Sequence, residues 1–174
     1  CLAIDAEGNT IDGDYILAIL AQGFKSRAKL KDSTVVATVM SNLGFLIAMK
    51  DAGISVAKTA VGDRYVLENM LENNYTLGGE QSGHIIMREF SGTGDGLLTA
   101  LQLLCEMARS KKSLKELSSI MQRFPQVLIN VSDVSKDNCA HQVQNPSSES
   151  WLKPKVIASP KKLQKNLPKL LKKN

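Results

Sequence analysis

The sequence has few of the side chains that bind transition metals or act as catalytic nucleophiles. It contains three cysteines, Cys1, Cys105 and Cys139, and two histidines, His84 and His141. The cysteines lie far apart and lack the spacing of metal ligands. No third residue is evident that would orient a serine and a histidine for nucleophilic catalysis. The odd number of cysteines predicts free thiols in a reducing cytoplasm, and Cys105 falls in an apolar helical pattern that predicts a core position.

Long apolar runs and nucleotide-binding motifs are also missing. No segment approaches the ~20 apolar residues of a membrane-spanning helix, and none resembles a secretory signal. The phosphate-binding pattern G-x-x-x-x-G-K-[ST] does not occur. Residues 91–96, SGTGDG, have the wrong glycine spacing for a dinucleotide fingerprint. We interpret them as a glycine-rich turn in which Asp95 caps the following helix.

Acidic residues are absent from the last 24 positions. Residues 151–174 hold eight lysines and no acid, a charge of +8, whereas residues 1–150 hold the other 14 basic residues and all 17 acids, a charge of −3. The mildly acidic body does not indicate nucleic-acid binding. The lysine-rich tail is expected to be largely disordered, a solubilising terminus being favoured over an arm that binds acidic partners.

The sequence does contain alternating strand and helix patterns. The run 34–40 is apolar and β-branched, which is typical of a strand covered on both faces, and 54–61 is a second strand. Two short strands around a turn are expected over 1–12. Helices are expected from Tyr15 to Arg27, from Leu43 to Gly53, from Gly62 to about Asn73 and from Leu97 to about Arg109, with a shorter helix capped by Ser113 and Glu116. Their predicted inward residues are Ile16, Ile19, Leu20 and Phe24; Leu43, Leu46 and Ile47; Val66, Leu67, Met70 and Leu71; and Leu97, Leu101, Leu104, Cys105 and Ala108. This order predicts an α/β fold with parallel strand pairing.

The segment 77–84, LGGEQSGH, concentrates hydrogen-bonding side chains between two predicted strands. Its glycines permit sharp turns and a close approach to a ligand. If the segment is extended, Glu80 and Ser82 share a face and can hold vicinal hydroxyls of a sugar. The alternative is a tight hairpin in which Glu80 and His84 are merely solvated.

A second candidate is the helix start at Gly62-Asp63-Arg64. Free backbone N–H groups and an arginine at such a position can meet an anion. Arg64 can equally be a solvated surface residue.

Four stretches together resemble the bacterial phosphoglucosamine mutases, a family of the α-D-phosphohexomutase superfamily. They are VATVMSNLG at 36–44, KTAVGDRYV at 58–66, LGGEQSGH at 77–84 and TGDGLLTALQLL at 93–104. The resemblance covers roughly residues 1–131. Glutamine at position 81 resembles the loop of the phosphoglucosamine branch, whereas the phosphomannomutase/phosphoglucomutase branch usually has methionine at this position.

The resemblance implies an isomerase that interconverts glucosamine 6-phosphate and glucosamine 1-phosphate for peptidoglycan precursors, through a phosphoserine and a sugar bisphosphate, with Mg²⁺ as cofactor. It implies that Glu80, Ser82 and His84 bind the phosphosugar substrate, and that Asp63 and Arg64 line the same cleft. The implied fold is a three-layer domain with a mixed, mostly parallel sheet flanked by helices. The implied location is the cytoplasm, with no membrane or nucleic-acid partner.

The phosphoserine loop, the Mg²⁺ loop and the C-terminal phosphate-binding loop of the family do not occur in the sequence. We therefore expect no catalytic residue or metal ligand in this chain, and the remaining domains of the same enzyme as its partners. The expected organisation is 1–12 as the end of a preceding domain, 13–125 as a sugar-binding α/β domain, 126–150 as the start of a C-terminal domain and 151–174 as a tail. A related phosphomannomutase/phosphoglucomutase and a non-catalytic binding domain are the alternatives.

Overall fold

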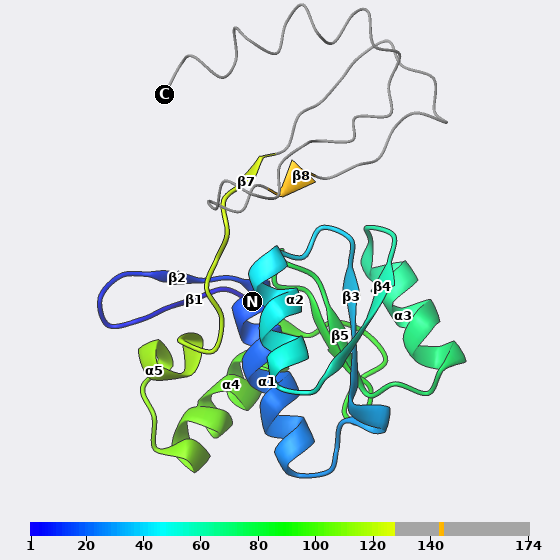
Figure 1. The fold of residues 1–174 in the computed structure, drawn as a ribbon. Helices are drawn as coiled ribbons and strands as arrows, with labels where there is room; N and C mark the ends of the chain where they lie inside the picture. The colour runs from blue at the N-terminus through cyan, green and yellow to red at the C-terminus, as the bar shows by residue number, and fades with distance from the viewer. Residues whose placement is uncertain (128–142, 145–174) are drawn as a thin grey trace, which may run out of the picture. The chain divides into compact units, whose positions relative to one another are not determined.

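The structure, a computed structural model, describes residues 1–127 and 143–144 (Figure 1). One compact unit comprises Cys1–Phe124, and a second begins at Pro125. The described residues of the second unit form β7 (Gln126–Val127) and β8 (Val143–Gln144), which pair antiparallel. The predicted tail at 151–174 and most of the predicted segment 126–150 lie outside the described residues.

The first unit is built on a four-stranded sheet in the order β4-β3-β5-β6. The central strand β3 (Thr34–Thr38) runs parallel to β4 (Ser55–Thr59) and to β5 (Leu77–Gly79). The last strand, β6 (Ile85–Met87), returns antiparallel to β5. The mixed, mostly parallel sheet that the family resemblance implies is therefore confirmed.

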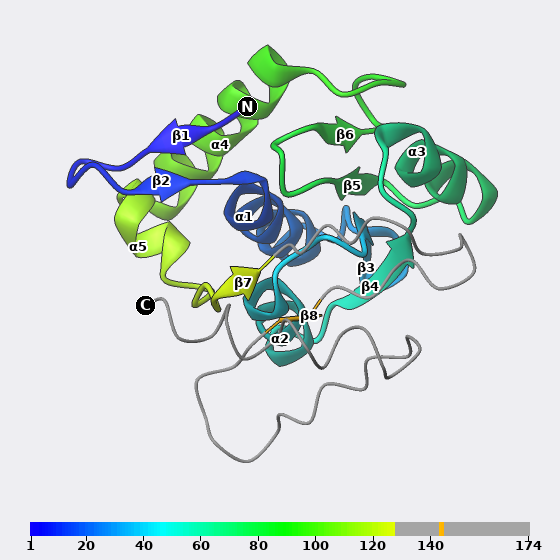
Figure 2. The ribbon, with the colours of Figure 1, turned by 90° about the horizontal axis from the view of Figure 1, so that it is seen from above.

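Helices cover both faces of this sheet, as Figures 1 and 2 show. On one face lie α1 (Gly13–Ser26) and α2 (Leu43–Asp51), and on the other lies α3 (Asp63–Glu72). All five residues of β3 are buried, which explains its nearly continuous apolar run. Successive side chains of a strand point to opposite faces, so Val35 and Ala37 join the core with α1 and α2 while Val36 packs with Val66 and Met70 of α3.

A short hairpin leads into the first helix. Strands β1 (Ala3–Ile4) and β2 (Thr10–Ile11) pair antiparallel, which confirms the prediction of two strands around a turn. Helix α1 begins two residues earlier than predicted, because Asp12 is its N-cap and accepts hydrogen bonds from the amides of Asp14 and Tyr15. Its four predicted core residues, Ile16, Ile19, Leu20 and Phe24, are all buried.

The inward faces predicted for α2 and α3 are partly wrong. In α2 the buried side chains are Phe45, Ala48 and Met49, whereas Ile47 is exposed. This helix is apolar around most of its circumference, so its sequence marks the inner face poorly. In α3, Val66 and Met70 are buried as predicted, but Leu71 is 57% exposed.

The predicted face of the next helix is wrong. Helix α4 (Gly96–Ser110) begins after Asp95 as predicted, but the expected core residues Leu97, Leu101, Leu104, Cys105 and Ala108 are all exposed, Leu97 by 73%. The buried face instead carries Thr99, Leu103 and Glu106. Glu106 pairs with Arg27 of α1 at 2.6 Å, so its charge is compensated and the buried face is less apolar than the exposed one.

The short helix α5 (Leu114–Ser118) follows with the predicted capping box between Ser113 and Glu116, which confirms its start. Within residues 1–127 and 143–144, no helix combines the length and the apolar character needed to cross a membrane.

Candidate functional site

The candidate site lies at one edge of the sheet. Because β3, β4 and β5 are parallel, the segments that follow them leave the sheet at the same edge. These segments are 41–42, 62–63 and 80–84, and they include the starts of α2 and α3. In open α/β sheets, ligands bind outside the carboxyl ends of the parallel strands. The fold therefore brings the two sequence segments singled out above, 77–84 and 62–64, to one edge.

The segment between β5 and β6 is a tight turn rather than an extended strand. The Gly83 amide donates to the Glu80 carbonyl at 2.9 Å, and the Glu80 amide donates to the His84 carbonyl at 3.0 Å. Gly83 has a φ of +94°, which glycine adopts without a steric cost. The condition under which Glu80 and Ser82 would share a face, an extended segment, is not met here, and Ser82 is exposed in the turn.

Glu80 is half-buried and fixed by a neighbouring segment. The amide of Gly62, the N-cap of α3, donates to Glu80 Oε1 at 3.0 Å. Gly62 has a φ of +129°, a backbone conformation that residues with a side chain rarely adopt. The contact joins the loop after β5 to the loop after β4. The alternative of a merely solvated Glu80 does not describe this structure.

His84 and Asp63 lie side by side. Nε2 of His84 is 3.4 Å from Oδ2 of Asp63, and both side chains are partly exposed. Gly94 packs against the imidazole so closely that a Cβ there would clash with it. The turn at 91–96 thus packs against His84. No pattern of side chains in the sequence predicts this contact.

Arg64 stands apart from these groups. Its side chain is 81% exposed, and its Nε donates to Glu68 Oε1, one helical turn further along α3, at 2.8 Å. The structure therefore brings together Glu80, His84 and Asp63, with Ser82 at the tip of the turn, and leaves Arg64 on the outer surface of α3.

The turn rests on the N-terminus of α1. The Gly13 amide donates to the Gln81 carbonyl at 3.0 Å, and the backbone nitrogen of Cys1 lies 2.6 Å from the Gly83 carbonyl oxygen. A side chain at Gly13 would collide with the backbone of residues 80–83. These supports were missed in the sequence, where the only signal is the glycine between Asp12 and Asp14.

Asp14 is the one carboxyl group beneath the loop with a strongly changed affinity for protons. Burial raises its pKa to about 6, against the hydrogen bond from the Asn42 amide, which lowers the pKa. The remaining described residues include no group of three or more His, Cys, Asp or Glu side chains arranged to hold a metal ion.

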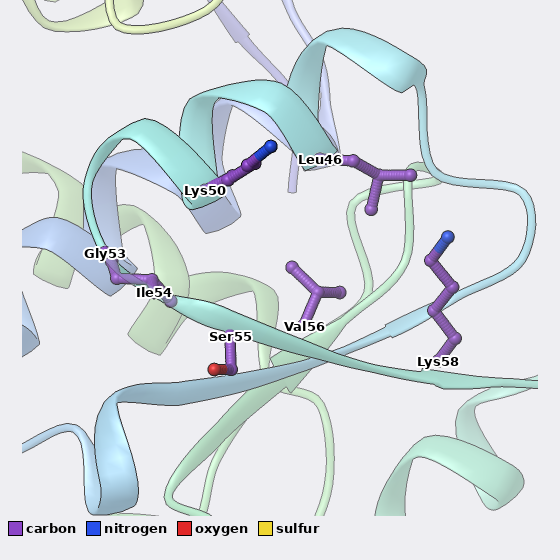
Figure 3. A pocket seen from close by; sticks show the side chains of 7 residues that line it. All are labelled: Leu46, Lys50, Gly53, Ile54, Ser55, Val56 and Lys58. Atoms are coloured by element: carbon purple, nitrogen blue, oxygen red, sulfur yellow. The ribbon is translucent and has the colours of Figure 1, made fainter.

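Two hollows open elsewhere on the first unit. One of about 530 Å³ lies between α2 and β4, with Lys50 and Lys58 at its rim (Figure 3). Another of about 340 Å³ lies between β1 and α4. Neither is lined by any of the five predicted site residues.

Comparisons with known proteins match the same segment. The family model for phosphoglucomutase/phosphomannomutase, alpha/beta/alpha domain III, matches residues 12–124. A phosphoglucosamine mutase of Leifsonia xyli is 63% identical over 77% of this chain and 30% of its own length. One of Paenarthrobacter aurescens is 59% identical over 80% of this chain and 31% of its own length. This chain thus spans about 30% of the length of these curated relatives.

A solved structure shares the fold. An N-acetylglucosamine-phosphate mutase, crystallised in a substrate complex, aligns with a TM-score of 0.64 at 19% identity, over 98% of this chain and 38% of that protein. The family match over residues 12–124 and this structural similarity both agree with the α/β/α layers described above. The chain belongs to the phosphoglucomutase/phosphomannomutase family and carries its alpha/beta/alpha domain III.

Proposed function

We propose that this chain is the sugar-recognition part of a phosphoglucosamine mutase, which interconverts glucosamine 6-phosphate and glucosamine 1-phosphate. The observation that carries the proposal is the placement of Glu80: its carboxylate is held by the Gly62 amide at the edge where α/β sheets bind ligands. The identity of about 60% to proteins named phosphoglucosamine mutase supports the substrate class.

Glu80 suits the recognition of adjacent sugar hydroxyls. An ionised carboxylate accepts hydrogen bonds through both oxygens, and the Gly62 amide engages Oε1 only. Oε2 can therefore accept from a ligand hydroxyl while the first bond keeps the side chain in place. Hydrogen bonds to an ionised acceptor are stronger than those between neutral groups.

The other site residues suit the same ligand. Ser82 offers an exposed hydroxyl in the turn, and His84 and Asp63 add an imidazole and a carboxylate that lie 3.4 Å apart. A phosphosugar that binds in two opposite orientations needs contacts to the ring that remain similar after reversal. Arg64 can contribute a cation for a phosphate group only when its guanidinium leaves Glu68.

The groups that transfer the phosphoryl group are assigned to the rest of the enzyme. We propose that its other domains supply the phosphoserine and the Mg²⁺ site, since the described residues contain no suitable ligand cluster. Bound Mg²⁺ would neutralise charge on the phosphoryl group. The cytoplasmic location remains a prediction.

Replacement of Glu80 by glutamine should weaken binding of glucosamine 6-phosphate about ten- to hundredfold, because a charged acceptor becomes a neutral one. The measurement is a titration of the full chain followed by ¹⁵N–¹H NMR. Glu72→Gln, an exposed carboxylate at the end of α3, is the matched control and should bind as the unmodified chain does. Equal affinities of the E80Q variant and the unmodified chain would remove Glu80 from the site. Tighter binding of mannose or glucose 6-phosphate would favour the related phosphomannomutase/phosphoglucomutase.

The chain by itself should not interconvert the two glucosamine phosphates. The chain can recognise the sugar but has no phosphoryl donor, because the phosphoserine and metal loops of the family do not occur in the sequence. A coupled assay for glucosamine 1-phosphate, with an intact relative as the positive control, measures this. Turnover above the blank would show that the donor lies within these 174 residues.

A further inference from the structure

Asp14 is a buried carboxyl group that no site residue touches directly. It lies in the first turn of α1 and is 0% exposed. One oxygen, Oδ2, accepts a hydrogen bond of 2.7 Å from the backbone amide of Asn42, the N-cap of α2. A buried carboxylate is costly unless it is hydrogen-bonded, so its presence requires an explanation.

The same carboxyl group faces the proposed sugar loop. The side chains of Gln81, in the turn, and of Ser41, before α2, lie close enough to Asp14 to favour its charged form, which lowers its pKa. The next residue back, Gly13, donates its amide to the Gln81 carbonyl. Gln81 is therefore held to the start of α1 through its backbone, and its side chain lies close to the Asp14 carboxyl group.

Asn42 extends this network. Its side-chain oxygen accepts from the amides of Gly44 and Phe124, and its side-chain amide donates to the Phe124 carbonyl at 2.8 Å. Asp14 thus lies between the turn at 80–84 and the start of α2, which is itself fixed by the end of the first unit.

Among the described residues, the groups named as acting on the pKa of Asp14 include no cation. The Asp12 carboxylate adds repulsion, and Asp12 itself lies 3.6 Å from Arg123. From the segment before α2 come the neutral groups of Ser41 and Asn42, and from the turn comes the neutral amide of Gln81. Burial is the dominant influence, and it raises the pKa of Asp14 from the ordinary 3.8 to about 6.

We propose that Asp14 is a positioning residue for substrate recognition, whose carboxylate holds the turn at 80–84 in register with the starts of α1 and α2. The inference rests on the proposed function. It adds that Asp14 positions Glu80 indirectly, through the neighbouring residue Gln81. When the carboxylate is protonated, it accepts fewer hydrogen bonds, and the turn loses part of its support.

The first test needs no ligand. In the full chain, the ¹⁵N–¹H signals of Gln81 and Asn42 should shift together over about pH 4 to 8, with one midpoint near the Asp14 pKa of about 6. In the Asp14→Asn variant this shared transition should disappear. Asp32→Asn, which changes an exposed aspartate paired with Lys31, is the control and should keep it. Independent titration of the two signals would overturn the proposal.

The second test uses glucosamine 6-phosphate at a pH above the transition. Asp14→Asn should weaken binding about two- to thirtyfold, the range for residues that act through a neighbour. The variant should nevertheless be no less stable than the unmodified chain, because it removes a buried charge. Unchanged affinity would contradict a positioning role, and lower affinity that only follows a loss of folded protein would indicate a structural one. If the unmodified chain binds no sugar phosphate, the proposed function fails, while the ligand-free titration still decides the role of Asp14.

The titration of Asp14 should also change the stability of the chain. The folded pKa of about 6 exceeds the ordinary 3.8, so the folded chain binds this proton more tightly than the unfolded chain. The contribution of Asp14 is therefore fully present below about pH 3.8 and is lost as the pH rises through about 6. Urea unfolding should show this decline in the unmodified chain and not in the Asp14→Asn variant.

Discussion

Replacement of Gly13 by alanine is expected to lower the free energy of unfolding by about 3 kcal/mol or more. A Cβ at this position would lie 2.7 Å from the Gln81 carbonyl oxygen and closer still to the Glu80 carbonyl. These are backbone atoms, which cannot rotate away as a flexible side chain can. The loop must then move from α1, and the hydrogen bond from the Gly13 amide to Gln81 must lengthen or break.

Urea unfolding followed by circular dichroism measures this effect. Gly92→Ala is the matched control, because an added methyl group there meets no atom within 4 Å. Its effect should stay within about 0.5 kcal/mol. A stability of the Gly13→Ala variant within about 1 kcal/mol of the unmodified chain would mean that the turn tolerates displacement, contrary to a tightly seated loop.

Replacement of Glu106 by alanine is expected to cost about 2 to 3 kcal/mol of stability. Glu106 is 7% exposed, accepts a hydrogen bond of 2.9 Å from Arg27 Nη1 and forms an ion pair of 2.6 Å with Arg27 Nη2. Its removal leaves Arg27 without this partner on the buried side of α1. The cost should fall below that of a fully buried pair, because the Arg27 side chain is 27% exposed and keeps some hydration.

The same unfolding measurement tests this prediction. Glu89→Ala breaks an ion pair of similar length with Lys29, but both of its side chains are over 40% exposed, so it should cost less than about 1 kcal/mol. The Arg27→Ala/Glu106→Ala variant should lose less than the sum of the single losses, because neither charge is left alone. Additive losses would show that the pair contributes nothing specific.

Glu106 also explains what the sequence could and could not predict. Strand β3 and helix α1 were predicted because most of their buried residues are apolar and follow the expected pattern. The face of α4 was predicted wrongly, because its buried side includes Thr99 and Glu106 while leucines occupy the exposed side. Apolar periodicity identifies a buried face only when that face is apolar. A face that buries polar residues with partners elsewhere in the fold does not show the pattern.

For the candidate site, the sequence indicated side chains but not their supports. The density of polar groups between two strands pointed to Glu80 and His84. The amide of Gly62 and the close packing of Gly94 involve backbone or a missing side chain from distant segments, which leave no periodic pattern. Only the three-dimensional fold shows that these segments meet.

The seating of the turn on α1 has a consequence for synthesis of the chain. The hairpin β5–β6 needs only nearby residues to form, whereas its anchors Gly13 and Asp14 precede it by more than 60 positions. On the ribosome these anchors emerge first, so α1 and α2 can be in place before residue 80 leaves the exit tunnel. The turn then forms against a surface that already exists. Residues synthesised earlier thus determine the final conformation of the turn. A delay in docking α1 would leave the glycine-rich hairpin free to pair incorrectly.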